Sequence, residues 1–263
     1  MLINSIEYTV TEGIGLLRVN RPEARNALNW QAQDRFAAII QEAAADHTLR
    51  ALILTGAGEQ AFVSGGDLKE LANHPEPEAG KRLNRTMSAA LAQMMALPLP
   101  VIAAINGDAL GGGCEIITAC DLRIAGAHAR LGFVQIRNAL TTGWGGGGRL
   151  VGLVGQSRAM ELLLTGRLLT ATEAQAIGLV HRVVPAGEDV LEAAFAWARE
   201  LQQLPREALA ALKSLVQTAG QENVDAYEAE LFVKLWTHPD HYEALAAFVE
   251  KRRPVFNQGI NGG

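Results

Sequence analysis

Cysteine, aromatic residues and long apolar runs are all scarce in this chain of 263 residues. Its two cysteines, Cys114 and Cys120, match no disulfide framework and no metal or redox spacing, so we expect two reduced thiols in the core. No stretch reaches about 18 uninterrupted apolar residues. Residues 1–7 lack the basic and apolar segments of a signal peptide. We therefore expect a soluble, cytoplasmic protein without a membrane partner.

Positive charge is scarce too. The chain has 28 acidic and 23 basic residues and a net charge of −5, whereas nucleic-acid-binding domains are normally basic, so we expect no nucleic-acid partner. None of the 6 histidines falls in a metal-ligand spacing, so we expect no metal site. Hydrophobic residues make up 49% of the chain, which excludes disorder caused by low hydrophobicity.

Glycine is the residue in excess. The 27 glycines are about 10% of the chain, against a typical share of about 7%. Many of them gather in three stretches, 56–66, 107–113 and 143–148. Because glycine permits close approach and unusual dihedral angles, the clusters indicate backbone that lies against something else.

Short apolar strands alternate with amphipathic helices. We predict a hairpin over 6–19 and buried strands over 51–55 and 101–105. Helices are predicted over 30–45, 81–96, 115–120, 189–203, 206–219, 222–236 and 239–251. A strand, a glycine turn and a helix follow one another twice, which is typical of parallel strands that meet ligands at their carboxyl ends. We expect an α/β core in residues 1–190 and a helical region in residues 191–263.

The sequence gives no support for two familiar enzyme motifs, the nucleotide-binding fingerprint and the serine-hydrolase elbow. The stretch 143–148 contains the letters G-x-G-x-x-G, but no apolar strand precedes it, so we interpret it as the glycine-rich start of a helix before Arg149 rather than a nucleotide site. No G-x-S-x-G elbow of a serine hydrolase occurs.

The first two glycine clusters suggest a different chemistry. Free N–H groups at two neighbouring turns would form an oxyanion hole that stabilises a carbonyl oxygen as it becomes an enolate. Glu115 follows within one helical turn and is a candidate acid or base. The alternative is that Glu115 only complements the positive end of its helix.

Several segments, in order, resemble the enoyl-CoA hydratase/isomerase (crotonase) family. They are NRPEARNAL at 20–28, AFVSGGDL at 61–68, NGDALGGGCE at 106–115, 164–166 with 171–180, and 248–256. The resemblance implies a crotonase-like fold, in which ββα repeats form a spiral core and the C-terminal helices serve oligomerisation. It also implies an acyl-CoA thioester substrate, coenzyme A as part of that substrate and not a separate cofactor, and a homotrimer or a dimer of trimers.

The resemblance also assigns roles to residues. The main-chain N–H groups of Ser64 and Gly112 correspond to the oxyanion hole of the family, and Glu115 corresponds to a catalytic glutamate. Contacts to coenzyme A are expected from Arg25, Gly65, Gly66, Asp67, Leu68, Gly111 and Lys251. For Arg25 the alternative is a solvated surface charge. Lys251 corresponds to a basic residue that reaches a phosphate, in some members from the neighbouring subunit.

One departure from the family concerns the reaction. Hydratases of the family use a second glutamate about twenty residues after the first, and this chain has Gln135 there. An amide neither gives nor takes a proton at neutral pH, although it orients water or a carboxylate through hydrogen bonds. We therefore interpret Gln135 as a polar positioning group, and its presence argues against hydration.

Loss of CO₂ from a malonyl-type thioester needs no base, because the breaking bond supplies the electrons. The chain looks like the ethylmalonyl/methylmalonyl-CoA decarboxylase branch of the family in residues 118–123, 133–134, 144–146 and 149–150. Gly143 and Trp144 would line the acyl pocket, unless Trp144 merely packs at a helix start. Decarboxylation is the leading prediction. The alternatives are an enoyl-CoA hydratase or isomerase that uses Glu115, and a non-catalytic CoA-binding protein.

Overall fold

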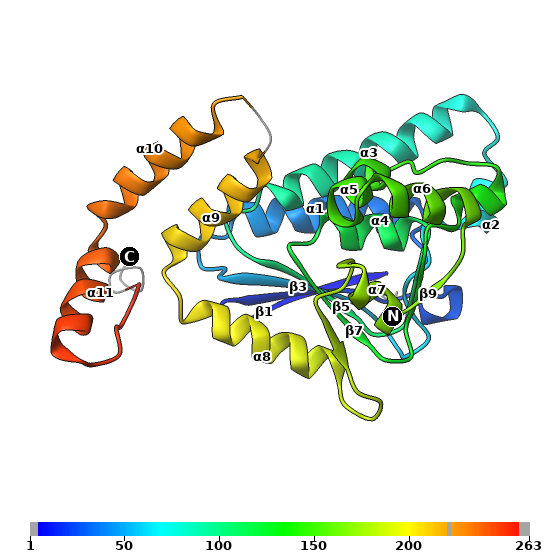
Figure 1. The fold of residues 1–263 in the computed structure, drawn as a ribbon. Helices are drawn as coiled ribbons and strands as arrows, with labels where there is room; N and C mark the ends of the chain where they lie inside the picture. The colour runs from blue at the N-terminus through cyan, green and yellow to red at the C-terminus, as the bar shows by residue number, and fades with distance from the viewer. Residues whose placement is uncertain (1–4, 220–221, 258–263) are drawn as a thin grey trace.

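The computed structural model describes residues 5–219 and 222–257, and its core is a mixed sheet covered by helices on both faces (Figure 1). Within these residues the larger sheet has the strand order β1-β2-β3-β5-β7-β10. Its strands are β1 Ile6–Thr11, β2 Ile14–Val19, β3 Ala51–Gly56, β5 Val101–Ile105, β7 Leu122–Gly126 and β10 Arg182–Val184. The predicted hairpin is the antiparallel pair β1 and β2, and the remaining neighbours are parallel, which confirms the α/β prediction.

A second, smaller sheet was not predicted. It has the order β4-β6-β8-β9, with β4 Ala61–Val63, β6 Asp108–Leu110, β8 Arg130–Gly132 and β9 Leu169–Thr170. Strands of two or three residues are too short to show a period in the sequence. The glycine clusters 56–66 and 107–113 do begin at the ends of the predicted strands β3 and β5, but the short strands β4 and β6 lie within them. The turns 64–66 and 111–113 therefore follow β4 and β6.

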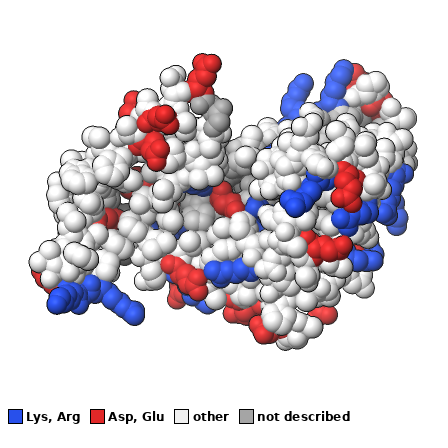
Figure 2. Space-filling view, viewed as in Figure 1, with Lys and Arg blue, Asp and Glu red and all other residues white. Residues whose placement is uncertain are grey.

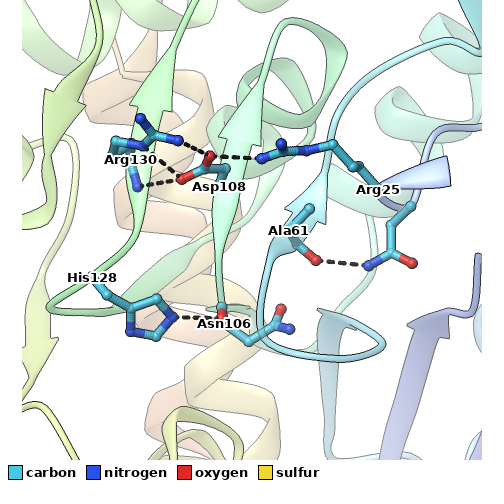
Figure 3. Close-up of polar contacts among 7 residues, drawn as sticks. Arg25, Ala61, Asn106, Asp108, His128 and Arg130 are labelled. Carbon is cyan, nitrogen blue, oxygen red and sulfur yellow. Dashed lines mark hydrogen bonds and ion pairs between the residues drawn. The ribbon is translucent and has the colours of Figure 1, made fainter. Parts of the chain in front are cut away.

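Asn106 and Gly107 join the two sheets between β5 and β6. The Asn106 side chain donates to the carbonyls of Gly56 and Gly58, at 2.9 and 2.5 Å, and accepts from the Gly56 N–H at 3.0 Å. Figure 3 shows His128 bonded to the Asn106 carbonyl, at 3.1 Å. A Cβ atom on Gly107 would lie 2.6 Å from the Ala61 nitrogen, so only glycine fits this turn.

The helices before residue 190 match the predictions in part. Their bounds are α1 Trp30–Ala45, α2 Leu68–Leu71, α3 Pro77–Met95, α4 Gly112–Ala119, α5 Gly146–Val154, α6 Gln156–Thr165 and α7 Ala171–Ala176, with 3₁₀ turns at Pro22–Ala24 and Val134–Asn138. Of these, α1, α3 and α4 match predicted helices and α5 begins in the glycine stretch interpreted as a helix start, whereas α2, α6 and α7 were not predicted. The Asn29 side chain caps α1 by accepting from the Ala32 N–H at 2.9 Å. Helix α3 begins four residues before the predicted 81, since Pro77 suits a first helical turn.

The larger sheet buries side chains on both faces. Leu52 and Leu54 of β3 point toward α1, α3 and α4, whereas Ile53 points to the other face, as alternation along a strand requires. That second face is covered by α8 Val190–Gln202, through Ala194 and Trp197 among others. The first helix after residue 190 therefore packs on the core sheet, and the division into 1–190 and 191–263 stays a prediction.

The last three helices form a tail that extends from the core (Figure 1). They are α9 Arg206–Thr218, α10 Val224–Trp236 and α11 Pro239–Glu250. Lys213 fastens α9 to the core through the Asp121 carboxylate, at 2.7 Å, and the Leu99 carbonyl, at 2.9 Å. The tail exposes large apolar side chains, which include Val216, Phe232, Val233, Trp236, Phe248 and Val249. In Figure 2 the visible face of the tail is largely uncharged, with charged side chains at its two ends.

The structure also tests the predictions about the cysteines and about membrane-spanning segments. Cys114 and Cys120 are free and buried, which confirms core thiols, and burial raises the pKa of Cys120 to about 12. None of the helices in the described part of the chain is both long enough and apolar enough to cross a membrane.

His181, just before β10, makes stability depend on pH. Its Nδ1 accepts from the Arg123 N–H at 3.1 Å, and desolvation together with the Arg123 charge lowers the pKa of His181 to about 4. The unfolded chain has a histidine pKa of about 6.5, so unfolding takes up a proton between these values. The stability that neutral His181 contributes is therefore fully present above about pH 6.5 and is lost as the pH falls toward 4.

We expect the thermal unfolding midpoint to fall by a few degrees between pH 7 and pH 5 because of His181. Thermal scans of the His181→Asn variant measure this contribution, because asparagine keeps an acceptor near the Nδ1 position but cannot be protonated. The difference between the two midpoints should shrink as the pH falls. Parallel curves for the two proteins would contradict the prediction.

Candidate active site

Two glycine turns meet at the ends of β4 and β6. The strands are parallel, with Val63 paired to Ala109, so residues 64–66 emerge beside residues 111–113. Gly65 has a φ of +97°, and a Cβ atom there would lie 3.0 Å from the Gly112 nitrogen. A Cβ atom on Gly113 would lie 1.9 Å from the Val63 carbonyl oxygen. The two main chains are therefore closer than any side chain would allow.

The structure brings the two predicted amide donors, Ser64 and Gly112, into these adjoining turns. Gly112 is the first residue of α4, where N–H groups have no partner within the helix. Across residues 5–219 and 222–257, neither the Ser64 nor the Gly112 N–H donates a hydrogen bond to another main-chain group. Two free donors in adjoining turns, one of them at a helix start, favour an oxygen that carries negative charge.

Glu115 lies on α4, one turn after Gly112, and is 2% exposed. Its carboxylate accepts four hydrogen bonds. Oε1 accepts from Gln135 Nε2 at 2.9 Å and from the Gly143 N–H at 3.0 Å, and Oε2 accepts from the Trp144 and Gly146 N–H groups at 2.7 and 2.8 Å. Gly146 permits this approach, since a Cβ atom there would lie 2.4 Å from Glu115 Cγ. The charge is thus held within the site and is not merely a complement to the helix end.

Gln135 stands beside Glu115 in the 3₁₀ turn after β8. The hydrogen bond to Glu115 fixes its amide orientation, because the reverse orientation would set an oxygen against the carboxylate. Gln135 Oε1 is buried and has no hydrogen-bond partner. A Cβ atom on Gly111, which has a φ of +53°, would lie 4.0 Å from the amide carbon of Gln135. The site thus contains one held carboxylate and one amide with an unpaired acceptor.

Trp144 packs directly on the candidate oxyanion hole. Its ring is 3% exposed, and a Cβ atom on Gly112 would lie 2.2 Å from it. Arg149 Nη2 donates to the carbonyls of Trp144 and Glu115 at 2.8 and 3.1 Å, and Asn84 donates to the Gly143 carbonyl. Gly143 and Trp144 therefore lie against the predicted site. Neither residue was predicted to be a site residue: Arg149 belongs to a segment that resembles the decarboxylase branch but was given no role, and Asn84 lies outside all the segments that carry the resemblance.

The loop 64–68 is hydrogen-bonded to residues 20–28, the first of the segments that resemble the family. Leu28 donates to the Gly65 carbonyl at 2.8 Å and accepts from the Asp67 N–H at 3.1 Å, and it forms a bridge with Gly66. Asp67 pairs with Arg21 at 2.9 Å. Leu68, at the start of α2, is 55% exposed and free to meet a ligand.

Arg25 is neither free nor fully solvated. Figure 3 shows it reaching from the first motif to the Asp108 carboxylate, at 2.9 Å, with Arg130 on the other side of the same carboxylate at 2.6 Å. Although burial of Asp108 opposes ionisation, its hydrogen bonds with Arg130 and the two positive charges lower the pKa of that carboxyl. Arg130 was missed, since nothing in its sequence context marks it.

The predicted contact residue Lys251 is not brought to this site. It ends α11 in the tail, at the opposite end of the molecule from α2 (Figure 1). Within one chain it therefore lies apart from the loop 64–68, and only a contact from a neighbouring subunit would fit the role that the resemblance gives it.

The class of protein follows from the fold. The crystal structure of an enoyl-CoA hydratase from Bacillus anthracis matches this chain with a TM-score of 0.90 and 34% identity, over 96% of this chain and 98% of that chain. A structure from Geobacillus kaustophilus matches with a TM-score of 0.89. The α/β core with its helical C-terminal region is the crotonase fold.

The family follows from the sequence. Residues 9–259 match the enoyl-CoA hydratase/isomerase family. A short-chain-enoyl-CoA hydratase of Clostridium acetobutylicum is 36% identical over 256 residues, which cover 96% of this chain and 97% of that protein. A 2,3-dehydroadipyl-CoA hydratase of Escherichia coli is 37% identical over 244 residues, which cover 92% and 94%. The chain belongs to the enoyl-CoA hydratase/isomerase family and is an enzyme of that family.

Proposed function

We propose that the protein decarboxylates a short malonyl-type CoA thioester. One observation carries the proposal: Gln135 occupies the place of a second glutamate, and the one carboxylate beside it, Glu115, already accepts four hydrogen bonds. Hydration needs groups that take and give protons. Decarboxylation needs mainly a site that stabilises an enolate.

The proposed reaction uses the two free amides. The bond between the α-carbon and the carboxylate breaks, CO₂ leaves, and the electron pair moves to the thioester oxygen. The N–H groups of Ser64 and Gly112 stabilise that oxygen, and each such donor contributes roughly 10²–10³ in rate. Water then supplies a proton to the α-carbon, and the hydroxide that remains combines with CO₂ as bicarbonate.

Coenzyme A would lie along the loop 64–68. Gly65, Gly66 and Leu68 offer main chain and an exposed apolar side chain there. Arg25, whose side chain is 50% exposed although it is paired with Asp108, offers a positive charge to a phosphate. We also propose that the exposed apolar face of the tail is covered by further copies of the chain, in a homotrimer or a dimer of trimers.

Hydration or isomerisation of an enoyl-CoA is the second candidate. The names of the two relatives, a short-chain-enoyl-CoA hydratase and a 2,3-dehydroadipyl-CoA hydratase, favour it. Glu115 would then be the base. One of the four hydrogen bonds to its carboxylate would have to break before the carboxylate could accept a proton. A CoA-binding protein without catalysis is the third candidate.

A panel of thioesters separates these candidates. We expect methylmalonyl-CoA or ethylmalonyl-CoA to lose CO₂ faster than in a sample without protein, with products followed by mass. Crotonyl-CoA and a 3-enoyl-CoA should stay largely unchanged. Robust hydration of crotonyl-CoA without CO₂ release would overturn the proposal and establish the second candidate. Thioester binding with no product of any kind would favour the third.

A further inference from the structure

The Glu115 carboxylate is fully occupied by donors of its own chain. A carboxylate offers about four lone-pair positions on its two oxygens. Here each oxygen accepts two N–H groups, at distances between 2.7 and 3.0 Å. Three of the four donors are main-chain amides, which do not rotate away as a side chain does. A proton from substrate or water therefore has no lone pair to approach unless this set of hydrogen bonds opens.

The same hydrogen bonds hold the wall of the site. They bind residues 143–146 to α4, and Trp144 within that segment packs its ring on Gly112. Arg149 closes the arrangement through the carbonyls of Glu115 and Trp144, and its Nε donates to the Thr118 hydroxyl at 3.1 Å. Glu115 is thus the common acceptor for the segment that places Trp144.

We propose that Glu115 is a positioning residue, which acts by holding Trp144 against the Gly112 turn, and that it does not carry a proton in the reaction. The inference rests on the proposed function, because hydration or isomerisation would need Glu115 as the base. In this proposal the buried Glu115 carboxylate determines the shape of the acyl pocket and thereby the placement of the substrate.

The first test needs no turnover. In a variant with Trp30, Trp197 and Trp236 changed to phenylalanine, Trp144 is the remaining tryptophan, and it can be excited selectively over the tyrosines. Adding Glu115→Gln replaces one carboxylate oxygen with an NH₂ group, which cannot accept from the two N–H donors that face it. The segment 143–146 should then loosen, so we expect red-shifted emission and stronger acrylamide quenching of Trp144. The matched control is Glu161→Gln, an exposed glutamate paired with Arg167 on the surface. Unchanged Trp144 emission in the Glu115 variant would overturn the inference.

A variant that retains the carboxylate guards against loss of folding. If Glu115→Gln gives no cooperative unfolding transition, Glu115→Asp replaces it, because the shorter side chain keeps the charge but does not reach all four donors. The expected result is again a more accessible Trp144. Native-like shielding of Trp144 in a folded Glu115→Asp protein would count against the positioning role.

The second test uses the kinetics of whichever thioester turns over. Glu115→Gln and Trp144→Phe should each lower kcat, and the double variant should lose little more than the worse single variant, because both act through one contact. The shape of the kcat profile against pH should be unchanged in Glu115→Gln. Multiplied losses, or a missing limb of that profile, would show independent proton transfer by Glu115 and overturn the inference.

The two proposals fail in different experiments. Absence of CO₂ release and of any other product from the unaltered protein would end the proposed function only, whereas turnover of an enoyl-CoA that is abolished in Glu115→Gln would end the inference as well. The emission of Trp144 would still decide whether Glu115 holds the wall.

Discussion

Replacing Gly112 with alanine is expected to lower kcat/KM by about 10²–10³, the contribution of one oxyanion-hole donor. The new methyl group would lie 2.2 Å from the Trp144 ring, so the ring or the turn that carries the Gly112 N–H must move. Overpacking of this kind also costs about 1–3 kcal/mol of stability. Steady-state rates and thermal unfolding of the same preparation separate the two effects.

Gly148→Ala is the matched control for that variant. Gly148 lies in α5, and a Cβ atom there meets nothing within 4 Å. We expect unchanged rates and a gain of roughly 0.5–1 kcal/mol in the free energy of unfolding, because alanine is the better helix residue. If Gly112→Ala turned over substrate as fast as Gly148→Ala, the Gly112 amide would not be a donor to the reacting oxygen.

Changing Gln135 to glutamate is expected to install a second carboxylate and with it hydratase activity. Two carboxylates of the kind that hydratases of the family use would then face each other where an amide now donates at 2.9 Å. General acid–base catalysis contributes typically about 10²–10⁴ in rate, so hydration of crotonyl-CoA should rise by a factor in that range. Absorbance loss of the enoyl thioester measures it.

The same variant should become less stable as the pH rises. Two carboxyl groups at this distance do not both ionise readily, so the folded protein keeps a proton that the unfolded chain releases. The unfolding midpoint of Gln135→Glu should therefore fall, relative to the unaltered protein, between pH 5 and pH 8. Gln41→Glu, on the exposed face of α1, changes the net charge equally and should show no such trend. A pH-independent difference in midpoint for Gln135→Glu would refute the pairing.

Much of the fold was predictable because it rests on local pattern. The hairpin, the buried strands β3 and β5 and the Asn29 cap of α1 follow from apolar period and capping chemistry. The second sheet was not predictable, since β4 and β6 are three residues each and are defined by their neighbours. Helix α8 looks like the other tail helices in sequence, and only the sheet face that it covers distinguishes it.

The candidate site, too, has parts that the sequence could predict and parts that it could not. Ser64, Gly112, Glu115 and Gln135 lie together as the motifs suggested. The donors to Glu115 were beyond sequence reasoning, because three are main-chain N–H groups located 28, 29 and 31 positions along the chain. A main-chain donor has no residue type that marks it. The spacing of the Gly143–Gly148 stretch was a signal, but it looked like a nucleotide motif and not a cradle for a carboxylate.

The hydrogen bonds of the Asn106 side chain have a consequence for binding. Its side chain ties the end of β3 to the connection between β5 and β6, and β6 leads directly to the Gly112 turn. The two amide donors are therefore fixed relative to each other when the chain folds, before any ligand arrives. We therefore expect the loss of conformational entropy on binding to fall mainly on the flexible thioester and not on these turns.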